Sequence, residues 1–301
     1  MAALNDIRAH IKSVEQTRKI TNAMYLISSS RMRKAMKNIE QNRAYFYRAF
    51  TTMREIRAHT GFEHPYITHR EGEGSDKTAY IIIAGERGLS GSYNGSILKV
   101  AEDSMEIHKP THIFTVGEKA AVYFKSRGRA VNENFVHIGQ APSIETARRL
   151  TNIVMGLYDA QEIDEVRLVY TRFKNSFTQI TTDMELLPIE FGGMGIDIGD
   201  KINDTENVLY EPSAEEVFNE LVPQFIIGYI YGALVHAYAS ENVARMSAME
   251  TATSSADELL EKLTHEYHTA RQVSITNELA EIVGAAAVLG DNQDNGKAGL
   301  L

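Results

Sequence analysis

Proline is absent from both ends of this 301-residue chain, and this distribution constrains its fold more than any other feature. All six prolines lie between Pro65 and Pro223, and glycine is also absent from positions 3 to 57. Proline and glycine are the residues least compatible with a helix interior. Each end can therefore be one continuous helix. At 1.5 Å per residue, positions 3–57 would span about 82 Å and positions 224–289 about 99 Å.

The N-terminal run carries a hydrophobic seam with a helical period. Alternating steps of three and four residues from Leu4 to Ile56 meet apolar or aromatic side chains at twelve of sixteen positions. A period of 3.5 residues keeps one face of a helix against a partner helix in a left-handed supercoil. The polar positions from Arg18 to Ser28 interrupt this seam. They indicate either a loosened stretch or a contact face for a partner.

The C-terminal run begins with a capping signal, because Ser213 is followed three residues later by Glu216. Pro223 is expected to kink or restart this helix. One seam follows Met246, Met249, Ala256, Leu260, Leu263, Tyr267 and Ala270, and a displaced one follows Ile275, Leu279, Ile282, Ala286 and Leu289. The second helix is about 16 Å the longer by its rise per residue. Its apolar end, positions 283–289, is expected to overhang and to need a socket on a partner.

Opposite charges indicate that the two helices pair with each other. Positions 1–57 hold twelve basic and four acidic residues, whereas positions 213–289 hold three basic and eleven acidic residues. Charges that flank an apolar seam help to select its partner. About 150 residues separate the two helices, so the chain leaves along one and returns along the other. We therefore predict an antiparallel coiled coil.

The region between the helices alternates apolar runs with amphipathic ones. Strands are expected at TAYIIIAG, HIFTVG, EVRLVYTRF and ITTDMELLPI, and helices at 92–108, 118–126 and 144–159. Such alternation predicts a Rossmann-like α/β domain with a largely parallel sheet. The expected organisation is an N-terminal coiled-coil helix over 1–58, a globular domain over 59–212, a C-terminal coiled-coil helix over 213–289 and a disordered tail over 290–301.

Composition removes several classes of function. The chain has no cysteine, which excludes disulfides, thiolate zinc sites, iron–sulfur clusters and thiol switches. The net charge of −9 argues against a surface devoted to nucleic acid. No run approaches the roughly 20 uninterrupted apolar residues of a membrane helix, and the first residues lack the apolar core of a secretory signal. We therefore expect neither a membrane span nor a signal peptide.

Three local motifs resemble known binding sites. Gly85 to Gly95 follows a strand and opens a helix, but its G-x-x-G-x-x-G spacing differs from the dinucleotide fingerprint and favours a tight turn. His265-Glu266-Tyr267-His268 places its histidines three residues apart rather than four, which favours a helix surface over a zinc site. The basic face at 31–37 could meet an acidic partner or simply be solvated. We find no catalytic, cofactor or metal constellation, so the chain itself is expected to be no enzyme.

Four stretches carry a resemblance to a known family. KITNAM at 19–24, SRMRKA at 30–35, SENVARMSAM at 240–249 and ARQVSITNELAEIV at 270–283 resemble the gamma subunit of F-type ATP synthases. RGLSG at 87–91 and YEPS at 210–213 are similar to further landmarks of that family. The resemblance covers residues 2–289.

This resemblance implies a non-catalytic rotor shaft that couples ion flow through a membrane c-ring to ATP synthesis or hydrolysis. The shaft would stand, as one copy per complex, within a ring of alternating alpha and beta subunits, and its α/β domain would bind the epsilon subunit and the c-ring. It would be a peripheral membrane protein on the cytoplasmic face of a bacterial plasma membrane. The resemblance implies these ring contacts: Met24, Arg33, Arg245, Gln272, Thr276 and Glu278.

Some positions depart from the family pattern. Asn22 and Tyr25 replace the usual Lys and Glu, Ser28 and Ser29 replace Ala, Ser90 replaces a frequent Cys, and Asn277 replaces Gln. Most of these lie at the expected ring contact and bear on the strength of coupling. Two other classes compete with the rotor: a coiled-coil scaffold that does not rotate, and a nucleotide-binding α/β enzyme with helical arms.

Overall fold

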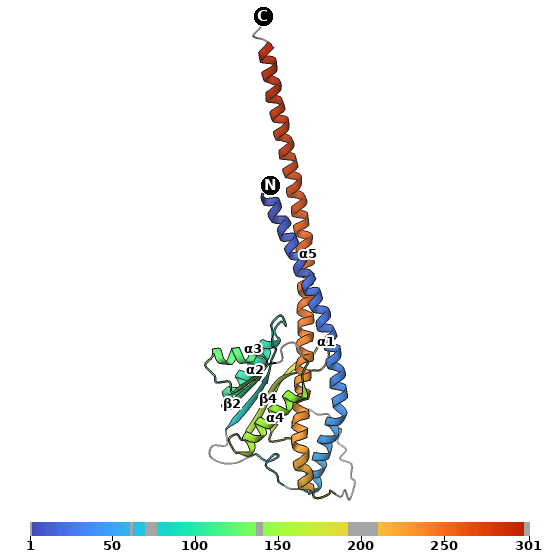
Figure 1. Cartoon of the computed structure of the whole chain (residues 1–301), viewed down its shortest axis with the longest axis vertical. Coiled ribbons are helices and arrows are strands. Elements are labelled where there is room, and N and C mark those ends of the chain that lie inside the picture. Colours follow the sequence, from blue (N-terminus) through green and yellow to red (C-terminus); the bar gives the residue numbers. More distant parts are fainter. Residues whose placement is uncertain (1, 61–62, 70–76, 137–140, 192–209, 298–301) are drawn as a thin grey trace. The chain divides into compact units, whose positions relative to one another are not determined.

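The computed structural model describes residues 2–60, 63–69, 77–136, 141–191 and 210–297, and within these ranges the side chains except those of 2–3, 42–45, 59–60 and 285–297. The chain forms two compact units. The coiled-coil unit comprises Met1–Tyr25 and Met249–Leu301, and the α/β unit comprises Leu26–Ala248. Two long helices, α1 (Ala2–Thr60) and α5 (Ala214–Lys297), contribute residues to both units (Figure 1).

A five-stranded sheet forms the centre of the α/β unit. Its strands are β1 (Thr78–Ile83), β2 (Pro110–Val116), β3 (Glu133–Phe135), β4 (Glu165–Phe173) and β5 (Gln179–Leu187). They lie in the order β3-β2-β1-β4-β5. The first four are parallel to their neighbours, and β5 runs antiparallel to β4. The predicted α/β class with a largely parallel sheet is confirmed.

Helices cover both faces of this sheet (Figure 1). One face packs against α2 (Tyr93–Ile107) and α3 (Glu118–Ser126), whereas the other packs against α4 (Ile144–Asp159), α1 and α5. Successive residues of β1 point to opposite faces, so Tyr80 and Ile82 enter the first core while Ile81 and Ile83 enter the second. Burial on both faces explains the unbroken apolar run TAYIIIAG, because a central parallel strand has no solvent side.

Aromatic side chains join α1 to α5 within the α/β unit. The ring of Phe46 stacks on Phe225 with centroids 5.0 Å apart, and Phe46 also lies 5.3 Å from Tyr229. Phe50 contacts Phe225 at 5.6 Å. Four residues further along α1, the contact lies four residues earlier on α5. The two helices therefore pack antiparallel. Most described seam positions of α1 are buried or half-buried, including Ala35 and Met53.

The coiled-coil unit has the same antiparallel register. Val14 packs with Ala256 and Leu263 in a small apolar cluster. Arg18 pairs with Asp257, Nε to Oδ1, at 2.6 Å. The hydroxyl groups of Thr21 and Thr253 lie 2.7 Å apart.

The polar interruption of the seam is neither loosened nor exposed at its key positions. Thr21 is 7% exposed and Ser28 is 2% exposed, so both are packed into helix contacts of their respective units. A small hydroxyl side chain can enter such a contact when a partner accepts or donates its hydrogen bond. For Thr21 that partner is Thr253. Of the predicted seam positions between Arg18 and Ser28, only Arg18 remains exposed.

The terminal helices run further than the sequence indicated. α1 ends at Thr60 rather than at position 58, and α5 continues to Lys297, so positions 290–297 are helical where a disordered tail was expected. A single glycine such as Gly290 costs only about 1 kcal/mol relative to alanine, and extending an existing helix is far easier than starting one. Residues 298–301 lie outside the described ranges.

Pro223 does not restart α5, which continues through it. Proline inside a helix costs about 3 kcal/mol, but its neighbours Val222, Phe225 and Ile226 are fully buried in the core, and that packing holds the helix together. The start of α5 agrees with the sequence, because the backbone N–H of Glu216 donates to Ser213 Oγ at 3.1 Å. The strand β3 was missed, because three residues carry no readable period.

Gly117, between β2 and α3, lies too close to Ala84 to carry a side chain, and substitution can test this. It has φ of +95°, and an added Cβ would lie 2.3 Å from the backbone oxygen of Ala84. Gly128 also has positive φ, +73°, but faces open space. We expect Gly128→Ala to cost about 1 kcal/mol through backbone strain alone and Gly117→Ala to cost clearly more, because Ala84 cannot move without displacing β1. Urea unfolding of both variants measures the difference, and equal losses would contradict the clash.

His236 makes the stability of the α/β unit depend on pH. It lies on α5, and burial lowers its pKa to about 4. The unfolded chain has the ordinary value near 6.5, so between these two pH values the unfolded state binds more protons and stability falls as the pH falls. At pH 5 the loss from this group is about 2 kcal/mol. His236→Gln should flatten the stability profile between pH 7 and 5, whereas His265→Gln, at an exposed position, should leave it as steep as in the parent chain.

Candidate functional site

The first candidate site is the loop between β1 and α2, residues 85–92. In open parallel sheets, ligands bind beyond the carboxyl ends of the strands, where the connections diverge to opposite faces. Here α2 after β1 and α4 before β4 cover opposite faces of the sheet. The crevice between β1 and β4 is therefore where a nucleotide would be expected, and its loop is the glycine-rich segment noted in the sequence.

Side chains of α5 fill this crevice. A Cβ placed on Gly85 would lie 2.7 Å from Glu241 Oε1 and 3.0 Å from Asn94 Oδ1, so a larger residue here would require these side chains to move. Asn94 Oδ1 accepts a hydrogen bond from the backbone N–H of Gly85 at 2.8 Å. The hydroxyl of Tyr93 donates to the carbonyl oxygen of Ala237 at 3.0 Å. The Glu241 carboxylate thus lies directly beside the backbone of this glycine-rich loop.

Arg245 completes this arrangement. Its Nη2 lies 2.5 Å from Glu241 Oε1 and 3.4 Å from the carbonyl oxygen of Gly88. The two side chains are only 10% and 13% exposed. Arg245, which the resemblance implies as a ring contact, is therefore not on an exposed helix face, because the helix turns it toward the β1–α2 loop. Glu241 was missed as its partner, although its spacing of four residues from Arg245 is a readable signal for an ion pair.

The other predicted ring contacts lie on helix surfaces. Arg33 on α1 is exposed and donates to Ser29 Oγ at 3.1 Å, and Met24 is half-buried. On α5, Gln272, Thr276 and Glu278 are all exposed. Thr276 donates to the carbonyl oxygen of Gln272 at 2.9 Å, and Ser274 donates to Glu278 at 3.2 Å. The structure thus places these last three residues on two adjacent turns, while Arg33 and Arg245 belong to the other unit.

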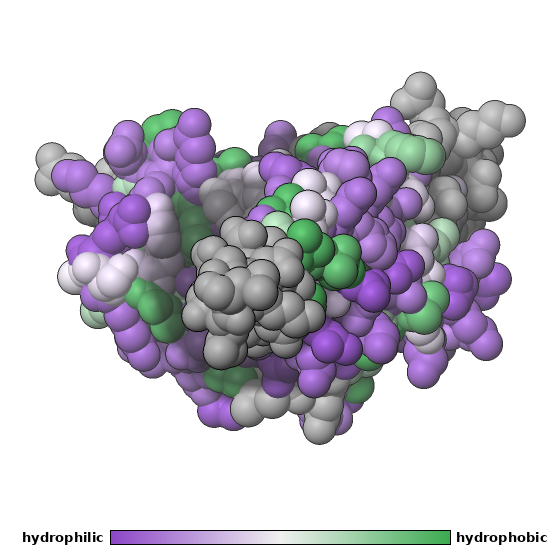
Figure 2. All heavy atoms as spheres, turned by 90° about the horizontal axis from the view of Figure 1, so that it is seen from above, coloured by the Kyte–Doolittle hydropathy of each residue, from purple (hydrophilic) through white to green (hydrophobic). Residues whose placement is uncertain are grey.

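The described end of α5 exposes an apolar stripe. Leu279, Ile282 and Val283 are 58%, 65% and 67% exposed, and Ile275 is also exposed. The predicted displaced seam is therefore uncovered at its described positions, while the side chains of 285–289 lie outside the described residues. Figure 2 shows hydrophobic residues on the visible face as separate groups among hydrophilic ones. An uncovered apolar stripe of this kind marks a site of interaction.

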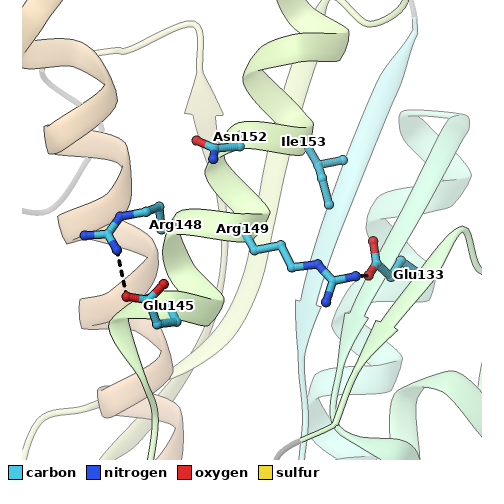
Figure 3. A pocket seen from close by; sticks show the side chains of 6 residues that line it. All are labelled: Glu133, Glu145, Arg148, Arg149, Asn152 and Ile153. Atoms are coloured by element: carbon cyan, nitrogen blue, oxygen red, sulfur yellow. Dashed lines mark hydrogen bonds and ion pairs between the residues drawn. The ribbon is translucent and has the colours of Figure 1, made fainter.

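A shallow pocket of about 390 Å³ lies beside α4 and β3. Figure 3 shows Arg148 directed at Glu145 and Arg149 directed at Glu133. Asn152 and Ile153 complete the lining. Both arginines are thus already paired with carboxylates, and each is at least half exposed. The pocket resembles a solvated, charged helix surface rather than a binding cavity.

A charged cluster links β4 to its neighbours. Arg167 pairs with Asp183 at 2.8 Å and with Glu165 at 2.6 Å, and Glu165 also accepts from Thr78 at 3.1 Å. Burial alone would lower the pKa of Arg167, but its hydrogen bonds to Asp183 and Glu165 raise it above its ordinary value. The charges are compensated within the cluster, which therefore fixes strands rather than binds a ligand.

The described residues offer no metal site, and one helix segment has the composition of a membrane span. Among the described residues, no group of three or more histidine or acidic side chains is arranged to hold a metal ion. The histidines His265 and His268 are both exposed on α5. By length and composition, α5 does contain one 18-residue window, of mean hydropathy 1.3, that could cross a bilayer, but half of that window is buried inside the protein. The core helix of a folded domain passes the same criterion, as the fully buried Phe225 and Ile230 illustrate.

The structure therefore defines a class of protein in which long N- and C-terminal helices pair antiparallel and both contribute to an α/β domain. The family model described as ATP synthase matches residues 3–289. The gamma chains of ATP synthase from Ruminiclostridium cellulolyticum and Alkaliphilus metalliredigens are 39% and 40% identical, each alignment covering 95% of this chain and 98% of the relative. The chain belongs to the family of ATP synthase gamma chains.

Solved structures share the fold. A chain of the Euglena gracilis mitochondrial ATP synthase, in a structure of OSCP, F1 and c-ring, superposes with a TM-score of 0.64 at 16% identity, over 97% of this chain and 96% of that one. A chain from the central stalk and c-ring of the Tetrahymena thermophila enzyme gives a TM-score of 0.59 at 23% identity, over 77% of this chain and 99% of that one. The combination of long terminal helices and an α/β domain is thus that of known central stalks.

The ion pair of Arg245 and Glu241 yields a prediction. Arg245→Ala leaves the Glu241 carboxylate buried without its partner, so we expect a loss of about 3 kcal/mol in the free energy of unfolding. Adding Glu241→Gln removes the orphaned charge and should recover a large part of that loss. Chemical denaturation of the parent, both single variants and the double variant measures the coupling. Additive losses would mean that the two side chains do not act as a pair.

Proposed function

We propose that this chain is the central-stalk rotor shaft of an F-type ATP synthase and is itself non-catalytic. The observation that carries this proposal is the antiparallel packing of α1 and α5 together with the uncovered stripe beyond it on α5. The membership of the gamma-chain family supports it. The filled crevice beside Gly85 argues against the competing nucleotide-binding enzyme.

In this role the rotational angle of the shaft determines how tightly each surrounding catalytic subunit binds nucleotide. A shaft with dissimilar sides presents different residues to each surrounding catalytic subunit, so its orientation favours a different nucleotide affinity in each. Because coupling free energies are reciprocal, nucleotide binding on the ring also biases the angle of the shaft. Nucleotide chemistry then takes place on the ring, and the shaft needs only stiffness and selective contacts.

The expected partners are the alpha and beta subunits around the helices and the epsilon subunit and membrane c-ring at the α/β domain. Gln272, Thr276 and Glu278 are exposed and can bond ring groups at some angles. Met24 and Arg33 are candidate contacts on α1. Arg245 remains a candidate only if its pair with Glu241 opens in the complex. The complex would lie at the cytoplasmic face of a bacterial plasma membrane.

A reversible disulfide crosslink to the ring can distinguish a rotating shaft from a non-rotating scaffold. The chain has no cysteine, so Ile275→Cys, which replaces a side chain 44% exposed, introduces a single thiol. A second cysteine is placed on the facing ring subunit of the assembled complex. If the chain rotates, forming the disulfide stops ATP hydrolysis and reduction restores it. Undiminished hydrolysis in the crosslinked complex would favour the non-rotating scaffold.

Gln272→Leu tests an individual ring contact. Gln272 is exposed, so the isolated variant should unfold within about 0.5 kcal/mol of the parent chain. In the assembled complex the lost hydrogen bond should lower ATP turnover by up to about tenfold, the factor given by roughly 1.4 kcal/mol. The matched control is Lys125→Gln, an exposed position on α3, which should leave turnover unchanged. Equal turnover in both variants would remove Gln272 from the contact set.

A further inference from the structure

The hairpin between β4 and β5 ends in an uncovered aromatic side chain. Phe177 is 99% exposed, the highest value among the large hydrophobic residues that the structure describes. An exposed phenylalanine at the end of a hairpin gains nothing from the fold of its own chain, because it buries no surface there. Its contribution has to come from something that covers it.

Hydrogen bonds fix the backbone of the turn that carries Phe177. Asn175 Oδ1 accepts hydrogen bonds from the backbone N–H groups of Phe177 at 2.9 Å and of Thr178 at 2.7 Å. The N–H of Lys174 donates to the carbonyl oxygen of Thr178 at 3.2 Å, and the N–H of Thr178 donates to that of Asn175 at 3.3 Å. Because the backbone of this turn is already ordered, binding of Phe177 has to order only the side chain.

The base of the hairpin is anchored in the α/β unit. Phe173, the last residue of β4, packs with Ala35 of α1 and with Val235, Ala239 and Val243 of α5. Arg172 lies opposite the half-exposed Ile180 across the hairpin. The hairpin therefore presents Phe177 from a rigid base rather than from a free loop.

The charges around the hairpin are of one sign. Positions 171–182 contain Arg172 and Lys174 and no acidic residue. An aromatic side chain with cations near its base is complementary to an apolar pocket with carboxylates at its rim.

We propose that Phe177 is a docking residue that inserts into an apolar pocket, bordered by carboxylates, on a protein subunit assembled with this chain. The inference rests on the proposed function, because it requires that such an assembly exists. A second copy of this chain is a poor occupant, since its own hairpin carries the same positive charges. A membrane surface is also disfavoured, because interfacial binding buries a broad apolar face, whereas Phe177 is a single side chain on a turn.

Photo-crosslinking identifies what covers the residue. The full chain carrying benzoylphenylalanine at position 177 is assembled into the ATP synthase complex, irradiated and digested for mass spectrometry. We expect a crosslink to one partner subunit, at a site lined by apolar residues with aspartate or glutamate beside them. A crosslink to lipid, to a second copy of this chain or to nothing would overturn the proposal.

Retention in the complex measures the contribution of the side chain. Phe177→Ser should raise the apparent Kd of this chain for the complex at least about tenfold, because buried aromatic anchors dominate interface energies. Phe177→Leu should retain most of the affinity. The matched control is Ile107→Ser, which removes another apolar side chain, 77% exposed, at the end of α2. It should bind as the parent chain does, and all isolated variants should unfold as the parent does.

Failure of the proposed function and failure of the docking site alone would give different results. If the parent chain does not copurify with alternating ring subunits, the proposed function fails and the docking site fails with it. If the parent assembles but Phe177→Ser is retained as well as Ile107→Ser, only the docking site is overturned. Asn175→Ala keeps the aromatic ring but loosens the turn, so a loss of affinity smaller than that of Phe177→Ser supports the role of the fixed turn, and an unchanged affinity shows that the turn has no such role.

Discussion

The packing of α1 against α5 is the constraint on which the rest of the structure depends. It joins the N-terminal helix to the C-terminal helix and attaches both to one face of the sheet through Phe46, Phe50 and Phe225. Among the ion pairs of the described residues, only Arg18 with Asp257 joins the two helices, and both side chains are half exposed. Such a pair contributes at most about 1 kcal/mol. Apolar burial therefore stabilises the pairing, and the opposite net charges act at longer range to favour this partner.

The position of α5 also affects the end of the sheet where ligands usually bind. A parallel sheet with helices on both faces leaves a crevice beyond its strands, which many proteins use for nucleotides. Here the same helix that pairs with α1 brings Glu241, Arg245 and the backbone of Ala237 to that crevice. The glycine at position 85 permits this close approach instead of a phosphate. The position beyond the strands is thus used to attach α5 to the sheet and not to bind a ligand.

Much of this architecture could be read from the sequence, because long periodic segments leave strong signals. The bounds of α4 and β4 agree with the expected ones, and the seam from Leu4 to Ile56 corresponds to described buried positions such as Val14, Ala35 and Met53. Local rules failed where tertiary packing competes with them. Pro223 is tolerated because its neighbours are buried, and β3 is too short for a period. The orientation of Arg245 depends on a loop more than 150 residues away, which helix periodicity cannot indicate.

The distribution of polar groups separates structural from contact surfaces in this chain. The polar side chains of Thr21, Glu241 and Arg167 are largely buried, and each has a partner within the protein. Where apolar groups are exposed, as at Leu279, Ile282 and Phe177, nothing in the described chain covers them. The described pocket is shallow and its arginines are already paired. In the proposed role these uncovered surfaces are where other subunits would contact the chain, and the buried polar pairs hold them in place.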